Sequence, residues 1–118
     1  MIKRSEIFDY AHRTYKVKPD YPFGKHPRYA VLRHTDNDRW FGLVMNVPKD
    51  RLGLKGGEAV EIVDVKCRPE KVDYLKTKPG FRPAYHMNKA HWLTVLLDGP
   101  VSKDEVLALL DESYALTK

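Results

Sequence analysis

The sequence has little cysteine and no long apolar run. Its single cysteine, Cys67, cannot form an internal disulfide, which agrees with a reducing compartment. The longest apolar run, near residues 93–97, is far short of the ~20 residues that a membrane-spanning helix needs. The N-terminal residues lack the apolar core of a signal peptide. We therefore expect a cytoplasmic protein with no membrane partner.

Several motifs of well-known catalytic sites are also missing. There is no Walker loop, no dinucleotide glycine fingerprint and no Gly-x-Ser-x-Gly elbow. Residues 53–57 lack the Gly-Lys-Ser/Thr ending of a phosphate loop and precede a strand pattern, so they predict a tight turn. Cys67, His86 and His91 are residue types that bind zinc, but no paired spacing brings them together. We therefore expect no metal, no cofactor and no enzymatic activity.

Basic residues are in excess over acidic ones. The chain holds 21 Lys and Arg against 16 Asp and Glu, which gives a net charge of +5 and a pI of about 9.3. Such an excess favours acidic partners such as nucleic acid. Residues 1–57 hold 12 Lys and Arg against 6 Asp and Glu, whereas residues 98–118 hold 2 against 5. The acidic C-terminal segment must therefore lie away from any polyanion.

Three segments carry helix signals. Ser5 can cap a helix that runs to about Tyr15 and has apolar residues at spacings of three and four. Pro69 suits the first turn of a short helix, where its missing N–H is tolerated. Ser102 and Glu105 form a capping box, which predicts the start of a C-terminal helix.

Strand signals occupy the middle of the chain. Residues 29–34 and 40–47 flank a turn at residues 35–39 and predict an antiparallel hairpin, the first candidate wing. Residues 59–65 alternate apolar and acidic side chains, which is typical of a strand with one wet face. Residues 93–97 are rich in large and β-branched residues and predict a core strand.

The order of these elements predicts the fold class. Residues 17–27 contain three prolines and a glycine, which predicts an irregular crossing segment anchored by Tyr21 and Phe23. Helices and strands do not alternate strictly, so we predict a single α+β domain over residues 1–118. It has an antiparallel β-sheet flanked by N- and C-terminal helices. Packing of both helices on one face leaves the opposite face or its loops free.

The segment 81–92 mixes aromatic, basic and imidazole groups more densely than any other window of the chain. It follows the Pro79-Gly80 turn signal and leads into the strand at residues 93–97, so we expect a structured loop or hairpin arm. Cations interleaved with aromatic rings suit phosphate contact combined with stacking on bases. The same residues also fit solvated surface charges around aromatic core anchors.

Three motifs in this chain resemble those of the MmcQ/YjbR family of small bacterial proteins. They are Val65-Lys66-Cys67-Arg68-Pro69-Glu70, then Pro83-Ala84-Tyr85-His86-Met87-Asn88-Lys89 with His91-Trp92, and finally Ser113-Tyr114-Ala115-Leu116. The resemblance extends from residue 29 to residue 116. It implies a fold similar to that of the bacterial frataxin homologue, an antiparallel sheet flanked by helices. It also implies DNA binding through a double-wing arrangement of β-hairpins.

The resemblance assigns expected roles to individual residues. Lys66 and Lys89 become the expected phosphate contacts. Their neighbours by this resemblance are Arg82, His86, Asn88 and His91. The expected nucleic-acid site also includes Tyr85, Arg33 and Arg39. The alternative for Tyr85, Trp92, Ser113 and Tyr114 is a structural role, which we favour for Trp92 and Tyr114. A frataxin-like iron site needs an acidic ridge, but the first helix offers only Glu6 and Asp9 among basic residues, so we do not expect iron.

The expected partner is therefore DNA, held mostly through its backbone by β-hairpin wings and a basic aromatic arm, with weak sequence preference. We expect a monomer. The alternative is a protein-interaction or small-ligand binding module that uses the aromatic arm as the wall of a pocket. A hydrolytic or transfer enzyme is a more distant alternative.

Overall fold

The computed structural model describes residues 1–118 and contains one five-stranded antiparallel sheet in the order β1-β2-β3-β5-β4. The strands are β1 (Ala30–Arg33), β2 (Trp40–Pro48), β3 (Ala59–Lys66), β4 (Phe81–Pro83) and β5 (Trp92–Leu96). The short strands β1 and β4 are the two edges, and each is paired with its neighbour in a hairpin. The two candidate wings therefore lie at opposite edges of the sheet, with β3 between them.

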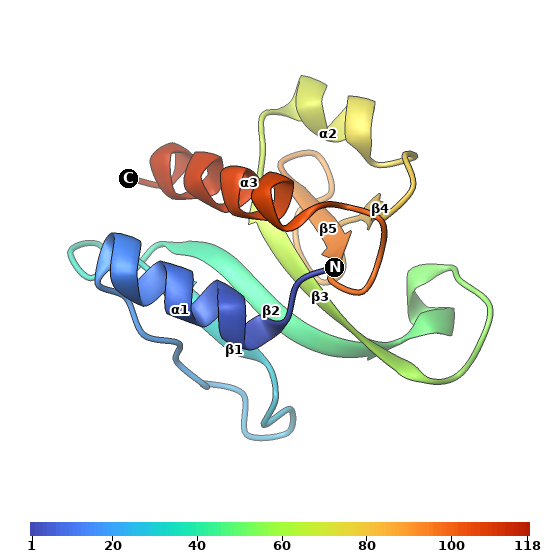
Figure 1. Cartoon of the computed structure of the whole chain (residues 1–118), viewed down its shortest axis with the longest axis horizontal. Coiled ribbons are helices and arrows are strands. Elements are labelled where there is room, and N and C mark those ends of the chain that lie inside the picture. Colours follow the sequence, from blue (N-terminus) through green and yellow to red (C-terminus); the bar gives the residue numbers. More distant parts are fainter.

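Two long helices cover one face of this sheet (Figure 1). The helical elements are α1 (Arg4–Tyr15), the 3-10 turn η1 (Lys49–Leu52), α2 (Pro69–Leu75) and α3 (Lys103–Leu116). The α+β class and the flanking by terminal helices are confirmed. The short helix α2 begins at the predicted proline, Pro69, whose missing N–H is free in a first turn. Its side chains Val72 and Leu75 are buried as expected.

The main core lies between α1, α3 and the helix-facing side of the sheet. It contains 21 buried residues, among them Ile7 of α1, Leu110 of α3 and Val63 of β3. A bulge in β2 disturbs the alternation of its side chains between the two faces of the sheet. Leu32 pairs with Gly42 and Arg33 pairs with Trp40, so Phe41 has no partner on β1. The bulge puts the Phe41 ring in the main core beside α3.

The opposite face of the sheet, which we call the open face, is not covered by a helix. It carries a second buried cluster of eight residues, most of them from β2 and β3, including Leu43, Met45 and Ile62. Three irregular segments pack over its margins, namely residues 17–29, η1 and the arm, residues 84–91. The face is therefore partly walled by loops, and the space between these loops is the accessible part of the sheet.

Of the two aromatic residues predicted to anchor the irregular segment 17–29, the structure confirms one, Phe23. Phe23 is half-buried and lies edge-on to both Tyr29 and Trp40, at 6.1 and 5.9 Å between ring centroids. Tyr21 was predicted to anchor the segment too, and this prediction is wrong, because its side chain is 51% exposed. Just before them, Asp20 bridges to Val31 of the edge strand and fixes the backbone of the segment there.

The start of α1 also differs from the prediction. Ser5 lies inside the first turn, and the N-cap is Lys3, whose backbone N–H donates to the Glu6 carboxylate at 3.0 Å. Ile2 and Ile7 are both buried in the main core, and they occupy the two positions of a hydrophobic staple. Burial of this apolar pair fixes the helix start two residues earlier than the serine signal indicated.

Ser102 is the N-cap of α3, and we expect its removal to lower the stability of the protein. Its hydroxyl oxygen accepts a hydrogen bond from the Glu105 backbone N–H at 3.2 Å. We expect Ser102→Ala to lower the free energy of unfolding by about 1 kcal/mol, because a first-turn donor loses its partner. Ser5→Ala, the matched control, should change it by less than about 0.5 kcal/mol. Urea unfolding of both variants measures this, and equal losses would contradict the assignment of the two caps.

Candidate functional site

The arm is fixed to the open face by a short chain of hydrogen bonds. The Tyr85 backbone N–H donates to the Thr94 hydroxyl at 3.0 Å, and that hydroxyl donates to the Asp64 carboxylate. Thr94 and Asp64 are opposite each other on β5 and β3, and both are fully buried. A buried acid in the central strand thus positions the first residues of the arm.

The arm is also held by contacts within itself. The Lys89 ammonium donates to the Ala84 carbonyl at 2.8 Å. The Asn88 side-chain oxygen accepts from the backbone N–H groups of Ala90 and His91, at 2.9 and 3.2 Å. His86 adopts a left-handed backbone conformation with φ of 63°. These contacts give the arm a defined shape and leave its aromatic and imidazole rings on its surface.

Asp64 is the one buried carboxylate of the open face with an oxygen that has no partner, Oδ2. Burial raises the pKa of this carboxyl to about 8, and the Thr94 hydroxyl and the charge of Lys89 act in the opposite direction. Its proton is therefore retained in the folded protein at a pH where an exposed aspartate is ionised. Asp64 acts as a neutral hydrogen-bonding group that supports the arm.

Four hollows lie next to one another over the open face and share lining residues, so they form one groove. The shared residues, in order along the groove, are Trp40 and Met87, then His26 and Tyr29, then Arg51 and Tyr85. The walls come from the β1–β2 hairpin, the irregular segment 17–29, η1, and the arm with its flanking strands β4 and β5. The ends of β3, at Lys66, and of α3, at Leu116, complete the lining. Segments far apart in sequence thus build a single surface feature.

The charged side chains that line this groove are all basic. No aspartate or glutamate lines any of the four hollows, whereas seven cationic side chains do. They are Lys25, Arg28, Arg39, Arg51, Lys66, Arg82 and Lys89. Four of them have partners within the protein. Arg28 lies 3.3 Å from the Glu61 carboxylate, and Arg39 donates to the Lys118 carbonyl at 3.4 Å. Arg82 and Lys89 donate to the carbonyls of Leu52 and Ala84, at 2.7 and 2.8 Å. The groove is a site for a polyanion on electrostatic grounds.

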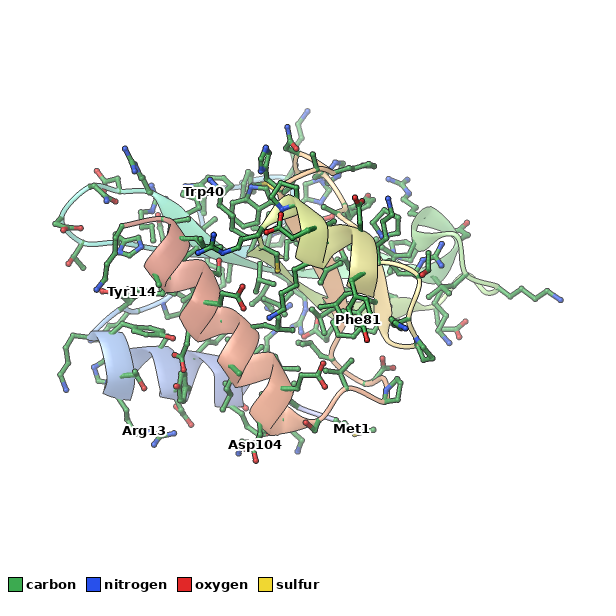
Figure 2. All side chains as sticks on the ribbon, turned by 90° about the horizontal axis from the view of Figure 1, so that it is seen from above. Met1, Arg13, Trp40, Phe81, Asp104 and Tyr114 are labelled. Atoms are coloured by element: carbon green, nitrogen blue, oxygen red, sulfur yellow. The ribbon has the colours of Figure 1, made fainter.

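Most of the acidic C-terminal segment lies on the other face of the sheet, and only its end, Leu116 and Thr117, lines the hollow beside Arg39 and Lys66. Helix α3 carries it and packs on the helix-covered face. Figure 2 shows Asp104 on α3 and Arg13 on α1 together at one side, with Trp40 at the side away from these helices. Repulsion between α3 and an anion in the groove is thereby reduced by the thickness of the sheet.

The middle of the groove is apolar. This central hollow has a volume of about 300 Å³, and six of its eight lining residues are hydrophobic. Its lining residues are Phe23, His26, Tyr29, Trp40, Leu43, Met45, His86 and Met87. Burial is the main cause that raises the pKa of the Tyr29 hydroxyl, so this ring stays neutral. The groove therefore has cationic ends and an aromatic centre.

The structure brings six of the nine predicted site residues to this groove. Arg39 and Lys66 line the hollow at one end, and Arg82, Tyr85 and Lys89 line the hollow at the other. The sixth, the imidazole of His86, lines the central hollow between them.

The other three predicted residues lie elsewhere or are engaged. The Asn88 side chain is used to fold the arm, and His91 is exposed on the arm but lines none of the four hollows. The Arg33 guanidinium forms an ion pair with Asp20, which is explained by the bridge between Asp20 and the edge strand. A phosphate would have to compete with that carboxylate for Arg33.

Sequence reasoning missed the contribution of the irregular segment and of η1. Lys25, His26, Arg28 and Tyr29 line the groove, as does Arg51 of η1. The run Lys-His-Pro-Arg-Tyr at residues 25–29 has the same mixture of cations, imidazole and aromatic rings as the arm. That composition indicates a second part of the site, whereas the prolines of the segment indicate only its irregular backbone.

Trp92, Ser113 and Tyr114 have structural roles. Trp92 is only 8% exposed, and the Tyr114 ring stacks on Tyr15 at 4.1 Å between centroids. The buried Ser113 hydroxyl donates to the Phe41 carbonyl at 2.6 Å and accepts from the Lys66 backbone N–H at 2.9 Å. Ser113 therefore joins α3 to both β2 and β3.

Metal-binding residues do not cluster anywhere in the structure, since no group of three or more His, Cys, Asp or Glu is placed to hold an ion. Cys67 is buried, and burial raises the pKa of its thiol to about 11, with the charge of Glu112 adding to the effect. The thiol is therefore protonated near neutral pH and is a small core side chain. No helix combines the length and the apolar character that crossing a membrane requires.

The fold and the groove define a class of small α+β proteins with a five-stranded antiparallel sheet, helices on one face and a basic, aromatic groove on the other. The YjbR family model matches residues 13–116. The chain belongs to the YjbR family.

Curated relatives support this assignment. The chain is 42% identical to the uncharacterized protein YyaQ of Bacillus subtilis (strain 168) over 118 residues, which are the whole of both chains. It is also 42% identical to the uncharacterized protein YjbR of Escherichia coli (strain K12) over 53 residues, 44% of this chain and 45% of that protein.

Solved structures agree with the fold. The crystal structure of a Pseudomonas syringae protein matches with a TM-score of 0.96 and 47% identity, covering 99% of this chain and 100% of that one. A Deinococcus radiodurans protein of domain type DUF419 matches with a TM-score of 0.74 over 98% of this chain and 78% of that one. Because its identity is 24%, this second match supports the fold alone.

Proposed function

We propose that this protein is a non-enzymatic DNA-binding protein that holds the DNA backbone in the groove of its open face. The observation that carries the proposal is the lining of the groove by seven Lys and Arg side chains with no Asp or Glu. Cations gathered along one groove neutralise successive phosphates and release counterions, which is the main source of sequence-independent affinity. Cations spread evenly over the surface would not do this.

The geometry favours backbone contact over the reading of base edges in duplex DNA. The long helices α1 and α3 pack on the opposite face, and only the C-terminal end of α3, at Leu116, reaches the groove, so neither helix is placed along it as a recognition helix. The groove cations come from the two sheet-edge hairpins, η1, the irregular segment 17–29 and the end of the central strand β3, where Lys66 lies. We therefore propose weak sequence preference and a double-wing mode, in which both sheet-edge hairpins contact one nucleic acid.

We further propose that the protein acts as a monomer in the cytoplasm. Both sheet edges are unsuited to pairing with a second copy. Edge strand β4 has three residues and ends in a proline, and edge strand β1 has four and is already bridged by Asp20. An edge-to-edge dimer would find few free backbone groups.

Salt dependence tests the proposal. If roughly three to five phosphates are neutralised, the slope of log affinity against log salt for a random-sequence duplex should be about −3 to −4.5. Fluorescence anisotropy at several salt concentrations gives this slope. Arg51→Gln should weaken binding about equally for all duplexes and reduce the magnitude of the slope by about one, because this exposed cation lines two of the hollows.

The matched control for that variant is Lys55→Gln. Lys55 is an exposed cation four residues further along the chain, and it does not line the groove. It should leave the slope unchanged. Lys66→Ala and Lys89→Ala should each resemble Arg51→Gln. Absence of salt-dependent binding to any duplex or single strand at low ionic strength would overturn the proposal.

A small-ligand binding module is the second candidate, and one observation favours it. The central hollow of about 300 Å³ is mostly apolar, with a few polar groups at its rim, as in many small-molecule sites. A thermal-shift screen against metabolites tests this candidate. Saturable stabilisation by a metabolite, combined with no DNA binding, would make it the better account of the groove.

A further inference from the structure

The central hollow has no role in backbone binding, which needs only the cations at the groove ends. Two aromatic groups form its walls. Phe23 lies edge-on to Trp40, at 5.9 Å and 89° between ring planes, and His26 stacks on Tyr29 at 4.3 Å. The aliphatic side chains at its base come from β2. A hollow of this kind suits a flat ring system with apolar faces.

Positive charge flanks this hollow on both sides along the groove. Arg39 and Lys66 line the neighbouring hollow on one side, and Lys25, Arg28 and Arg51 line the one on the other. A nucleic-acid strand has the matching pattern, because each base is attached between two phosphates. An uncharged aromatic ligand would not need the cations, and a purely ionic ligand would not need the aromatic walls.

We propose, building on the DNA-binding function above, that the central hollow receives one unpaired base of a DNA strand while the flanking cations hold the phosphates on either side. Aromatic side chains stack on bases of any sequence, which agrees with weak sequence preference. The imidazoles of His26 and His86 line the hollow and can donate to or accept from the edge of the base. A paired base within a duplex is stacked between its neighbours and cannot enter.

The test compares four fluorescent probes of equal length at one salt concentration. They are a single strand, a fully paired duplex, a duplex with one extra unpaired thymine, and the same duplex with an abasic site in place of that thymine. We expect the single strand and the bulged duplex to bind about tenfold more tightly than the paired duplex. The abasic probe should return to the affinity of the paired duplex, because only the base is missing.

Paired substitutions locate the base. Phe23→Leu removes one aromatic wall and should lower affinity for the bulged duplex about fivefold or more, with no change for the paired duplex. Tyr21→Leu is the matched control, since this exposed tyrosine lies two residues away and outside the hollow. In the unmodified protein, the bulged probe should quench the total tryptophan fluorescence more than the abasic probe does, because Trp40 lines the hollow, and Trp40→Phe should remove this difference while leaving the emission of Trp92.

The outcomes separate this inference from the proposed function. Equal, salt-dependent affinity for paired, bulged and abasic probes would overturn the inference and leave backbone binding in place. No binding to any probe at low salt would overturn both. Saturable binding of free thymidine monophosphate with no binding of any strand would also overturn both, and would assign the hollow to a small ligand.

Discussion

Replacing Ser113 by alanine should lower the free energy of unfolding by about 2 to 4 kcal/mol, the cost of two lost hydrogen bonds in a dry site. The serine hydroxyl is fully buried and is the partner of two backbone groups, the Phe41 carbonyl and the Lys66 N–H. Alanine cannot bond to either group, and water cannot reach the Phe41 carbonyl without opening the helix–sheet interface. The effect should appear as a lower urea midpoint with an unchanged m-value.

A neighbouring substitution on the same helix provides the control for Ser113. Glu112 forms a half-exposed ion pair with Lys71 at 2.6 Å, so Glu112→Gln should cost less than about 1 kcal/mol. A loss below about 0.5 kcal/mol in Ser113→Ala would show that the hydroxyl does not join α3 to the sheet. The serine of the family motif at residues 113–116 would then need another explanation.

Asp64→Asn should raise the stability of the protein at pH 8 by on the order of 2 to 5 kcal/mol while leaving it nearly unchanged at pH 4. In the folded protein burial raises the pKa of Asp64 to about 8, whereas the solvent-exposed carboxyl of the unfolded chain has a pKa of 3.8. Asparagine keeps an oxygen for the Thr94 hydroxyl but has no charge to bury.

The sign of this effect follows from the proton balance. Between about pH 4 and pH 8 the unfolded chain has lost the Asp64 proton while the folded protein retains it, so wild-type stability falls as pH rises through this window. The variant lacks this contribution, so its advantage should grow by at most about 1.4 kcal/mol per pH unit. Urea unfolding from pH 4 to pH 8.5 measures it.

An exposed acid serves as the control for Asp64. Asp73 on α2 pairs with Lys76 at the surface, so Asp73→Asn should give no pH-dependent gain above about 0.5 kcal/mol. If Asp64→Asn were less stable than the wild type at pH 8, the carboxylate would be ionised in the folded state and held by Lys89. The arm would then depend on a buried charge pair.

The regular elements could be predicted from local sequence because local chemistry determines them. The strand boundaries at residues 40 and 59 and the helix start at Pro69 all follow turn or proline signals and agree with the structure. Three predictions about these elements are wrong, namely Ser5 as a cap, Tyr21 as an anchor and a solvent-exposed face for the strand at residues 59–65, and all three depend on tertiary contacts. The buried pair Ile2 and Ile7 fixes the start of the helix, the bridge from Asp20 to β1 fixes the backbone just before the tyrosine, and the arm covers the face of the strand.

The site could be predicted only where its residues are close in sequence. The arm could be predicted because the aromatic and cationic residues of the segment 81–92 fall within twelve positions of the sequence. Arg51 and the segment 25–29 join it through packing across the open face, which no local pattern encodes. Asp64 could not be recognised either, because an acid that alternates with Val63 and Val65 is typical of a strand with one solvent-exposed face. Only the fold shows that the arm covers that face.

Chemical-shift mapping tests the central claim most directly, because it reports which face of the sheet meets the ligand. ¹⁵N-labelled protein would be titrated at low salt with a short bulged duplex. The groove account predicts that shifts concentrate at residues 25–29, 39–40, 51 and 84–89, with little change along α1 and α3. Shifts concentrated on those helices would contradict the groove account, as would no shift anywhere at saturating DNA.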